Sequence, residues 1–280
     1  MTATVLHCED SGGGNDRCVF VFLHGFMGNA RSFAPVVECL AKKSRCISFD
    51  LPGHGRSPFA RSDRLRELQT MEGVARLILE DLERLEVGRF ILYGYSMGGR
   101  VAQHAAMLDP ARVEALVLES ASFGIAETGR RRQRYIGDQR LLDGIGSQKD
   151  FEAFLAEWHR LPIFCTLAGT PLLEKLIREK LDNHPEELRK ALKIMSVGNH
   201  PFLAERLAGL SIPIFYFCGA QDQAYMQLGG TMQEWLPSLT IRAFAGASHN
   251  VHVQFPAEIV RTLGAIAAKK IPDDNGQCLG

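Results

Sequence analysis

The chain has 280 residues, of which 46% are hydrophobic and 23% charged, and it contains 27 glycines and 12 prolines. This composition excludes a collagen-like, low-complexity or broadly disordered polymer. The 32 lysines and arginines balance the 32 aspartates and glutamates, so no overall field would draw the protein to nucleic acid or to an anionic membrane. Any anion that the protein binds must therefore be bound by a local cluster of cations.

Three features of the sequence predict a cytoplasmic protein. No apolar run approaches the ~18 residues that a transmembrane helix needs. The first residues lack the basic and apolar regions of a secretory signal. The seven cysteines are odd in number and lack metal-binding spacing, so we expect reduced thiols. With no phosphate-binding glycine loop either, no cofactor and no metal are expected; the oligomeric state is not predicted.

Continuous apolar runs that end in glycine or turn residues predict buried parallel strands. Five such runs cover residues 18–23, 46–49, 90–95, 113–118 and 213–218, and a sixth at 240–244 alternates as an edge strand does. Helical patterns lie between them, and the pattern at 72–85 is the clearest because its apolar residues share one face. This alternation predicts a mostly parallel, doubly wound α/β sheet.

The alternation of predicted strands and helices stops over residues 121–207. That stretch has no strand-like run but several amphipathic segments, among them 151–158 and 186–195. We expect a helical lid inserted into an α/β core made of residues 1–120 and 208–271, with a flexible tail at 272–280. Placed after a strand, the insertion would cover the carboxyl edge of the sheet, where open α/β sheets bind ligands.

Ser96 is the first candidate for chemistry. It lies in Gly-Tyr-Ser-Met-Gly at 94–98, directly after an expected strand and before an expected helix. This context fits G-x-S-x-G, in which a sharp strand-to-helix turn exposes a nucleophilic serine. The start of a helix also favours negative charge on the serine oxygen. The alternative is a chance serine in a glycine-rich turn.

An activated serine needs a base and an acid that orients it, in the chain order Ser, Asp, His for this arrangement. Asp222 follows the expected strand at 213–218, and His249 follows the strand at 240–244, so both should reach the sheet edge that carries Ser96. His252 is the rival base, but it lies nearer the following helix. We therefore predict a triad of Ser96, His249 and Asp222.

A pair of main-chain N–H groups should stabilise negative charge on a substrate oxygen. The residues after the first strand, His24-Gly25-Phe26, and the residue after Ser96 are suitably placed. We expect the N–H groups of Phe26 and Met97 to form this oxyanion hole, a contribution of about 2.7–4 kcal/mol per donor in measured cases. His24 itself is predicted to be structural.

Five segments together resemble the α/β-hydrolase superfamily. They are HGF at 24–26, DLPGHGRS at 50–57, GYSMGG at 94–99, GAQD at 219–222 and GASHN at 246–250. The resemblance extends over nearly the whole chain and implies an α/β-hydrolase fold with a catalytic triad. It does not identify the substrate, because one fold serves many reactions.

Further segments resemble one branch, the 2-succinyl-6-hydroxy-2,4-cyclohexadiene-1-carboxylate synthase family of menaquinone biosynthesis. They are GYSMGGR at 94–100, EWHRLPIF at 157–164, MSVGNHPFLAERL at 195–207 and HNVHVQFP at 249–256. The resemblance implies a carbon–oxygen lyase, in which the triad removes a ring proton from a small polycarboxylate and pyruvate is expelled. Ser248 departs from the family, which usually has glycine before the histidine.

A polycarboxylate substrate requires fixed cations, and arginine suits this because its guanidinium can make two parallel hydrogen bonds to one carboxylate. Arg100 lies one helical turn beyond Ser96, so both should lie on the same helix face. The alternative for Arg100 is an ordinary surface arginine. Tyr95, beside Ser96, either adds a hydroxyl to the site or packs next to it.

Three lid residues enter by resemblance alone. The family's substrate arginine, four residues before an aspartate, selects Arg134 from the basic cluster at 130–134, the rest of which should be solvated. Trp158 matches a lid tryptophan near the substrate, or packs within the lid. A further basic residue is expected late in the lid, where Lys180 and Arg178 are the candidates.

Two other classes of function stay open at this level. A serine hydrolase, either a carboxylesterase or a C–C bond hydrolase, would use the same three residues to attack a carbonyl or to activate water. A ligand-binding receptor on the same fold would retain the site for recognition only.

Overall fold

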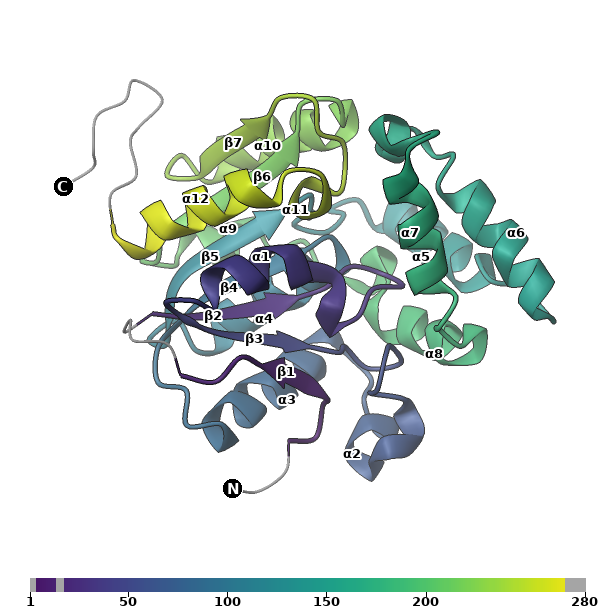
Figure 1. Ribbon diagram of the computed structural model, residues 1–280, viewed down its shortest axis with the longest axis horizontal. Coiled ribbons are helices and arrows are strands. Elements are labelled where there is room, and N and C mark those ends of the chain that lie inside the picture. The colour runs from purple at the N-terminus through teal and green to yellow at the C-terminus, as the bar shows by residue number, and fades with distance from the viewer. Residues whose placement is uncertain (1–3, 14–17, 270–280) are drawn as a thin grey trace.

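The computed structural model describes residues 4–13 and 18–269. A seven-stranded sheet in the order β1-β3-β2-β4-β5-β6-β7 lies at its centre (Figure 1). The strands are β1 (Cys8–Asp10), β2 (Val19–Leu23), β3 (Arg45–Phe49), β4 (Phe90–Tyr95), β5 (Val113–Glu119), β6 (Ile214–Gly219) and β7 (Thr240–Phe244). Only β1 is antiparallel to its neighbour. The predicted tail at 272–280 lies outside the described residues.

Helices follow most of the parallel strands. They are α1 (Ala34–Leu40), α2 (Asp63–Arg66), α3 (Met71–Arg84), α4 (Met97–Leu108), α5 (Thr128–Arg140), α6 (Gln148–Trp158), α7 (Pro171–Lys180), α8 (Pro185–Met195), α9 (Ala204–Ala208), α10 (Gln223–Trp235), α11 (Val251–Gln254) and α12 (Pro256–Ala267). Short 3-10 turns are η1 (Ala30–Phe33), η2 (Phe59–Arg61), η3 (Pro162–Leu167) and η4 (Val197–Asn199). Within the described ranges, no helix combines the length and apolar character needed to cross a membrane.

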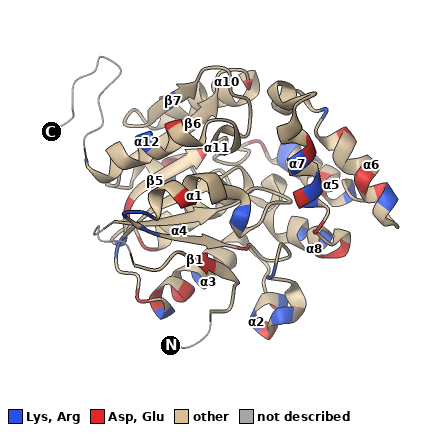
Figure 2. Cartoon of the chain, viewed as in Figure 1, with Lys and Arg blue, Asp and Glu red and all other residues tan. Residues whose placement is uncertain are grey.

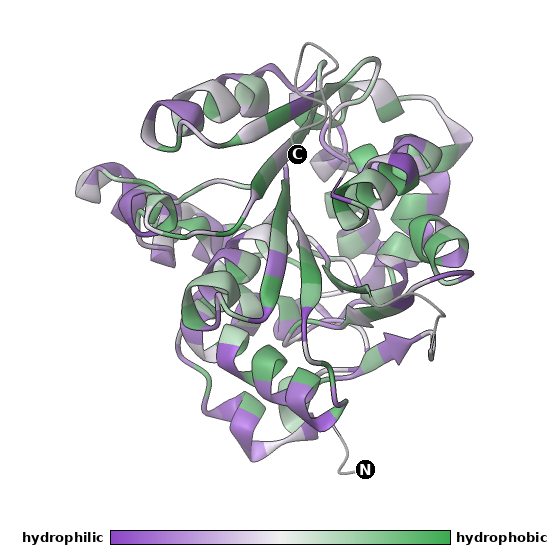
Figure 3. Ribbon diagram, turned by 90° about the vertical axis from the view of Figure 1, so that its left-hand side faces the viewer, coloured by the Kyte–Doolittle hydropathy of each residue, from purple (hydrophilic) through white to green (hydrophobic). Residues whose placement is uncertain are grey.

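Alternate side chains of each strand face opposite sides of the sheet, which explains why the strands are apolar throughout. Along β4, Leu92 packs in the core under α3 and α4, whereas Ile91 and Tyr93 pack in the core with α1 and α12. The central strands are accordingly hydrophobic along much of their length (Figure 3). Charged residues gather instead on helices such as α2, α3, α6 and α8 (Figure 2).

The predicted fold class, a mostly parallel α/β sheet of the α/β-hydrolase type, is confirmed. All six predicted strands are present, with ends that differ by no more than one residue, and the helix expected at 72–85 is α3. The edge strand β1 was missed because it is only three residues long and two of these, Glu9 and Asp10, are acidic. Such a segment carries no apolar signal.

Helices α5 to α8 gather beyond one end of the sheet, on the right in Figure 1. Side-chain caps start several of them: the Ser147 hydroxyl accepts the Asp150 N–H at α6, and the Thr170 hydroxyl accepts the Leu173 N–H at α7. Helix α8 joins this layer to the sheet, because Leu188 packs with α6 while Met195 belongs to the core under the sheet. The last helix of the stretch, α9, packs on α4 and α10.

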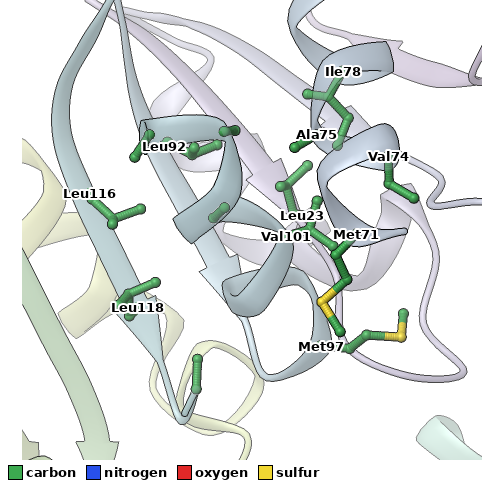
Figure 4. Packing of buried hydrophobic residues seen from close by; sticks show 14 of the residues in the cluster. Leu23, Met71, Val74, Ala75, Ile78, Leu92, Met97, Val101, Leu116 and Leu118 are labelled. Carbon is green, nitrogen blue, oxygen red and sulfur yellow. The ribbon is translucent and has the colours of Figure 1, made fainter. Parts of the chain in front are cut away.

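Two glycines allow α4 to begin against the strand ends. A Cβ added at Gly94 would lie 2.5 Å from the Gly99 Cα, and one at Gly98 would lie 2.2 Å from the Leu23 carbonyl oxygen. Both distances are far below van der Waals contact. Farther along α4, Val101 belongs to the packed cluster that α3, α4 and the strands share (Figure 4). The first turn of α4 is therefore wedged between β2 and β4.

We expect Gly98→Ala to destabilise the protein by about 1–3 kcal/mol, because the added methyl group must push α4 away from β2. Gly230→Ala is a matched control in α10, where an added Cβ meets nothing within 4 Å. It should be neutral or stabilise by roughly 0.5–1 kcal/mol, as expected for glycine replaced inside a helix. Urea unfolding of both variants tests this prediction. Equal stabilities of the two variants would refute the close packing of α4 against β2 at Gly98.

Candidate active site

Ser96 occupies the tight turn between β4 and α4. Its backbone has φ 49° and ψ −108°, a left-handed conformation that is strained for a residue with a side chain. The Ser96 N–H donates to the main-chain oxygen of Glu119 at 2.8 Å, and its carbonyl accepts the Arg100 N–H at 3.3 Å. Neighbouring elements thus hold the strained turn in place, with Ser96 on the wall of a cavity.

His249 lies between Asp222 and Ser96. Its Nδ1 is 2.8 Å from the Asp222 Oδ2, and its Nε2 is 3.3 Å from the Ser96 Oγ. Both partners of the first contact are nearly inaccessible to solvent, with 3% of His249 and 2% of Asp222 exposed. Since the carboxylate can only accept, Nδ1 carries the proton and Nε2 is left to accept the serine hydroxyl. This arrangement can move a proton away from Ser96.

The rival histidine, His252, is directed elsewhere. Its Nδ1 lies 2.9 Å from both carboxylate oxygens of Glu119, at the end of β5. It is also buried, with 2% of its surface exposed. The structure therefore places His249, and not His252, beside Ser96.

The peptide between Gly25 and Phe26 is held in one orientation. Its carbonyl oxygen lies 2.7 Å from the His24 Nδ1 and 3.0 Å from the Gly28 amide nitrogen. The Leu51 N–H donates to the His24 Nε2, so the Nδ1 of His24 must carry the ring proton. Because N–H and C=O point in opposite directions across a trans peptide, the Phe26 N–H points away from these partners.

His24 therefore holds the Gly25–Phe26 peptide without being charged. Burial lowers the pKa of His24 to about 4, so the ring is neutral near pH 7. Phe26 and Met97 both line the cavity that contains Ser96.

The cavity beside Ser96 is bounded by strand ends on one side and by helices α5 to α8 on the other. Its lining residues are Phe26, Tyr95, Ser96, Met97, Arg100, Arg134, Asp138, Leu141, Trp158, Ile163, Phe164, Lys180, Leu192, Tyr225, His249 and Asn250. All the substrate residues expected from the sequence, namely Arg100, Arg134, Trp158, Tyr95 and Lys180, are among them. Arg178, the alternative to Lys180, is exposed and is not.

Arg100 and Lys180 are cations without carboxylate partners. Arg100 donates from Nη2 to the Met195 carbonyl at 2.9 Å, but its buried Nε has no partner. Lys180 makes one long contact, 3.5 Å from Nζ to the Met27 carbonyl. Burial lowers the pKa of Arg100 to about 10 and that of Lys180 to about 8. Within the described ranges, neither cation is in an ion pair.

Arg134 differs because it is already neutralised. Its Nε lies 2.7 Å from the Asp138 Oδ1, one turn farther along α5, and its side chain is 55% exposed. Asp138 also accepts the Ser196 hydroxyl at 2.7 Å. Arg134 can therefore offer hydrogen bonds at the cavity rim but adds little net charge.

Among the cavity residues that sequence reasoning missed, Tyr225 and Asn250 lie next to the predicted triad. Tyr225 donates its N–H to the Asp222 Oδ1 at 3.3 Å, and its ring centroid lies 4.5 Å from that of His249. Asn250 lines the cavity and has a buried Oδ1 without a partner. Their only sequence signal was closeness to Asp222 and His249 along the chain. Among residues 4–13 and 18–269, no group of three or more His, Cys, Asp and Glu could hold a metal ion.

The η3 segment contacts the loop that carries His249. The His249 N–H donates to the Ile163 carbonyl at 2.9 Å, and the Phe164 ring packs edge-on against the imidazole, with 5.8 Å between centroids. Ser248, unusual in place of glycine, accepts a hydrogen bond at 2.7 Å from the Thr166 hydroxyl. The extra hydroxyl of Ser248 thus has a partner in η3.

Comparison with known proteins shows the family to which the chain belongs. The family model of the α/β hydrolase fold matches residues 19–256. A putative 2-succinyl-6-hydroxy-2,4-cyclohexadiene-1-carboxylate synthase of Bacillus subtilis is 33% identical, over 87% of this chain and 88% of the relative. The enzyme of that name from Salmonella paratyphi C is 31% identical, over 94% and 98% of the two chains.

Solved structures extend the comparison. The structure of MenH from S. aureus matches with a TM-score of 0.84 at 27% identity, covering 94% of this chain and 98% of that one. A thermophilic esterase from Thermogutta terrifontis has a TM-score of 0.74 at 24% identity, covering 94% and 93%, and this likeness supports the fold alone. The chain therefore belongs to the α/β-hydrolase superfamily and, within it, to the 2-succinyl-6-hydroxy-2,4-cyclohexadiene-1-carboxylate synthase family.

Proposed function

We propose that this enzyme is a carbon–oxygen lyase that converts 2-succinyl-5-enolpyruvyl-6-hydroxy-3-cyclohexene-1-carboxylate to 2-succinyl-6-hydroxy-2,4-cyclohexadiene-1-carboxylate and pyruvate. The observation that carries the proposal is that Arg100 and Lys180, two cations that line the cavity of Ser96, have no carboxylate partner among the described residues. Both side chains are partly buried, and withdrawing a charge from water is costly unless the charge is paired. The substrate has three carboxylates, so it can supply the missing partners.

The first step is the removal of the ring proton at C2, which is acidified by the adjacent succinyl ketone. Ser96 is the proposed base: its oxygen takes the C2 proton as His249 takes the hydroxyl proton through Nε2. Asp222 stabilises the imidazolium that results, because its carboxylate accepts the Nδ1–H. The electron pair of the C–H bond passes to the ketone oxygen, where the Phe26 and Met97 N–H groups are proposed to stabilise the enolate.

The second step is the loss of the group at C5. The enolate electrons re-form the ketone and give C2=C3, the ring double bond moves from C3=C4 to C4=C5, and the C5–O bond breaks. The oxygen leaves as the enolate of pyruvate, which takes one proton on its methylene carbon. The proton now on His249 is available for this purpose, so the step needs no redox partner.

Helices α5 to α8 are proposed to act as a lid, the role expected for residues 121–207. They contribute Trp158, Lys180 and Leu192 to the cavity wall, and η3, between α6 and α7, contributes Ile163. Excluding water there would strengthen each contact between a cation and a carboxylate. A cytoplasmic location is also proposed; it is supported by the thiols of Cys8, Cys39, Cys46, Cys165 and Cys218, which form no disulfide within residues 4–13 and 18–269.

The direct test is pyruvate release from the enolpyruvyl substrate, measured with lactate dehydrogenase and NADH. We expect rapid release by the wild type and a kcat about 10²–10⁴-fold lower for Ser96→Ala, because the base is lost. The hydrogen bond between Ser96 and His249 also fits a serine hydrolase. Turnover of p-nitrophenyl esters with an acyl-enzyme burst, without pyruvate release, would support that alternative and reject the lyase.

Arg100→Ala should raise KM for the tricarboxylate by roughly 10-fold or more, since hydrogen bonds to charged groups contribute about 1.5–3 kcal/mol. Arg178→Ala is the control, because that arginine lies near Lys180 in α7 but is exposed and outside the cavity. Steady-state kinetics with the pyruvate assay compares the two variants. Equal KM values for both variants and the wild type would remove Arg100 from the binding site.

The pH dependence of KM should depend on Lys180. Burial lowers the pKa of this ammonium to about 8, and only the nearby Glu179 carboxylate opposes the effect. The charged form is therefore lost as pH rises through about 8, and we expect KM to increase between pH 7 and pH 9. In Lys180→Met the KM should already be high at pH 7 and should not rise further over this interval. The same rise in both proteins would contradict the assignment.

A further inference from the structure

Glu119, the last residue of β5, is a buried carboxylate outside the triad. None of its surface is exposed, and three donors surround its side chain. The Tyr93 hydroxyl lies 2.5 Å away, the His252 main-chain nitrogen 3.2 Å, and the His252 Nδ1 2.9 Å. Burial and the carboxylate itself raise the pKa of Tyr93 well above 10, so Tyr93 keeps its proton and donates it.

Residues at the end of β5 also contact the segments that carry Ser96 and His249. The Glu119 carbonyl accepts the Ser96 N–H at 2.8 Å. The hydroxyl of the next residue, Ser120, donates to the His249 carbonyl at 3.1 Å. Ser120 has φ 47°, a left-handed conformation that is strained for serine and turns the chain at the end of β5. Residues 119 and 120 thus contact the Ser96 turn on one side and the His249 loop on the other.

The sheet order explains why such a link is needed. Ser96 follows β4, whereas His249 follows β7, and β5 and β6 lie between them. At about 4.8 Å per strand, β7 is about 14 Å from β4. The loop after β7 must therefore cross back over two strand ends to bring His249 within 3.3 Å of Ser96. Asp222, at the end of β6, holds the imidazole of this loop, and the Ile163 carbonyl of η3 accepts the His249 N–H.

We propose that Glu119 is a positioning residue for the reaction: together with Ser120, it sets the spacing between Ser96 and His249. The Glu119 side chain holds His252 at the start of α11, Ser120 holds the His249 carbonyl, and the Glu119 carbonyl holds the Ser96 N–H. The second carboxylate–histidine pair, Glu119 and His252, thus orients the first pair without touching the substrate. This role rests on the proposed function, since it presumes that Ser96 and His249 act together.

Glu119→Gln is the first test. Glutamine has one acceptor oxygen, and its NH₂ group would face a donor, either Tyr93 or His252. The loop should shift, and misplacement by about 1 Å costs about 100-fold in rate. We expect kcat for pyruvate release to fall about 10- to 100-fold, while KM stays within about twofold, because the cations that bind substrate are untouched.

A matched control separates positioning from loss of stability. Asp81 is another carboxylate with no exposed surface, and it accepts the main-chain N–H groups of Val5 and Leu6 at 2.8 Å, in the loop before β1. Asp81→Asn should destabilise the protein to chemical denaturation but leave kcat unchanged. Equal losses of kcat in Asp81→Asn and Glu119→Gln would overturn the proposal.

Ser120→Ala covers the case in which Glu119→Gln does not fold. It removes only the hydroxyl that holds the His249 carbonyl, and alanine leaves the strained φ as it is. We expect a smaller fall in kcat, again with KM unchanged. A Ser120→Ala enzyme with wild-type kcat would show that this part of the link does not position His249.

A substrate-free measurement distinguishes failure of this proposal from failure of the lyase assignment. In proton NMR spectra, the Nδ1–H of His249 and of His252 should give separate downfield signals, identified by their loss in Asp222→Asn and Glu119→Gln. We expect Glu119→Gln to remove the His252 signal and also to broaden or shift the His249 signal, while Asp81→Asn leaves both. An unchanged His249 signal in Glu119→Gln rejects positioning, whereas absence of pyruvate release by the wild type rejects only the lyase.

Discussion

The turn at Ser96 constrains the rest of the site. Helix α4 can begin against β2 and β4 only because Gly94 and Gly98 have no side chain to separate them. The turn then presents the Ser96 hydroxyl at the edge of the sheet in a strained conformation, and the Glu119 carbonyl is one of the groups that hold it there. The other reacting groups are brought to this fixed point by loops, so their accuracy depends on contacts made beyond the ends of the strands.

The charges that line the cavity distinguish the reactions that a serine in such a turn can catalyse. A serine, a histidine and an aspartate in hydrogen-bond contact fit ester hydrolysis and proton abstraction equally well. The cavity differs from a simple ester-binding pocket because Arg100 and Lys180 line it without a carboxylate partner in the part of the chain that the structure describes, whereas Arg134 is neutralised by Asp138. A polycarboxylate would offset the cost of partly burying these two cations, and this electrostatic match is the basis of the proposed lyase function.

Local patterns predicted the elements that are long and buried. The strands β2 to β6 are continuous apolar runs because helices cover both faces of the sheet. The G-x-S-x-G turn is recognisable because close packing of α4 against the strands leaves no room for a side chain at its two glycines. The edge strand β1 has no such pattern. Tyr225 and Asn250 carried no signal beyond their nearness to Asp222 and His249, since a single tyrosine or asparagine in a loop is common whether or not it lines a site.

The sequence by itself determined the fold class, the place of Ser96 and the order of the elements that carry Asp222 and His249, because each depends on a few neighbouring residues. The sequence also predicted that His249, rather than His252, pairs with Asp222. Only the tertiary structure decided that His252 pairs with Glu119. His249 pairs with Asp222 and His252 with Glu119, although the two histidines are three residues apart. The physical reason is that the second pairing depends on how the loop after β7 crosses the ends of β5 and β6, and a contact between residues 133 positions apart leaves no trace in local sequence.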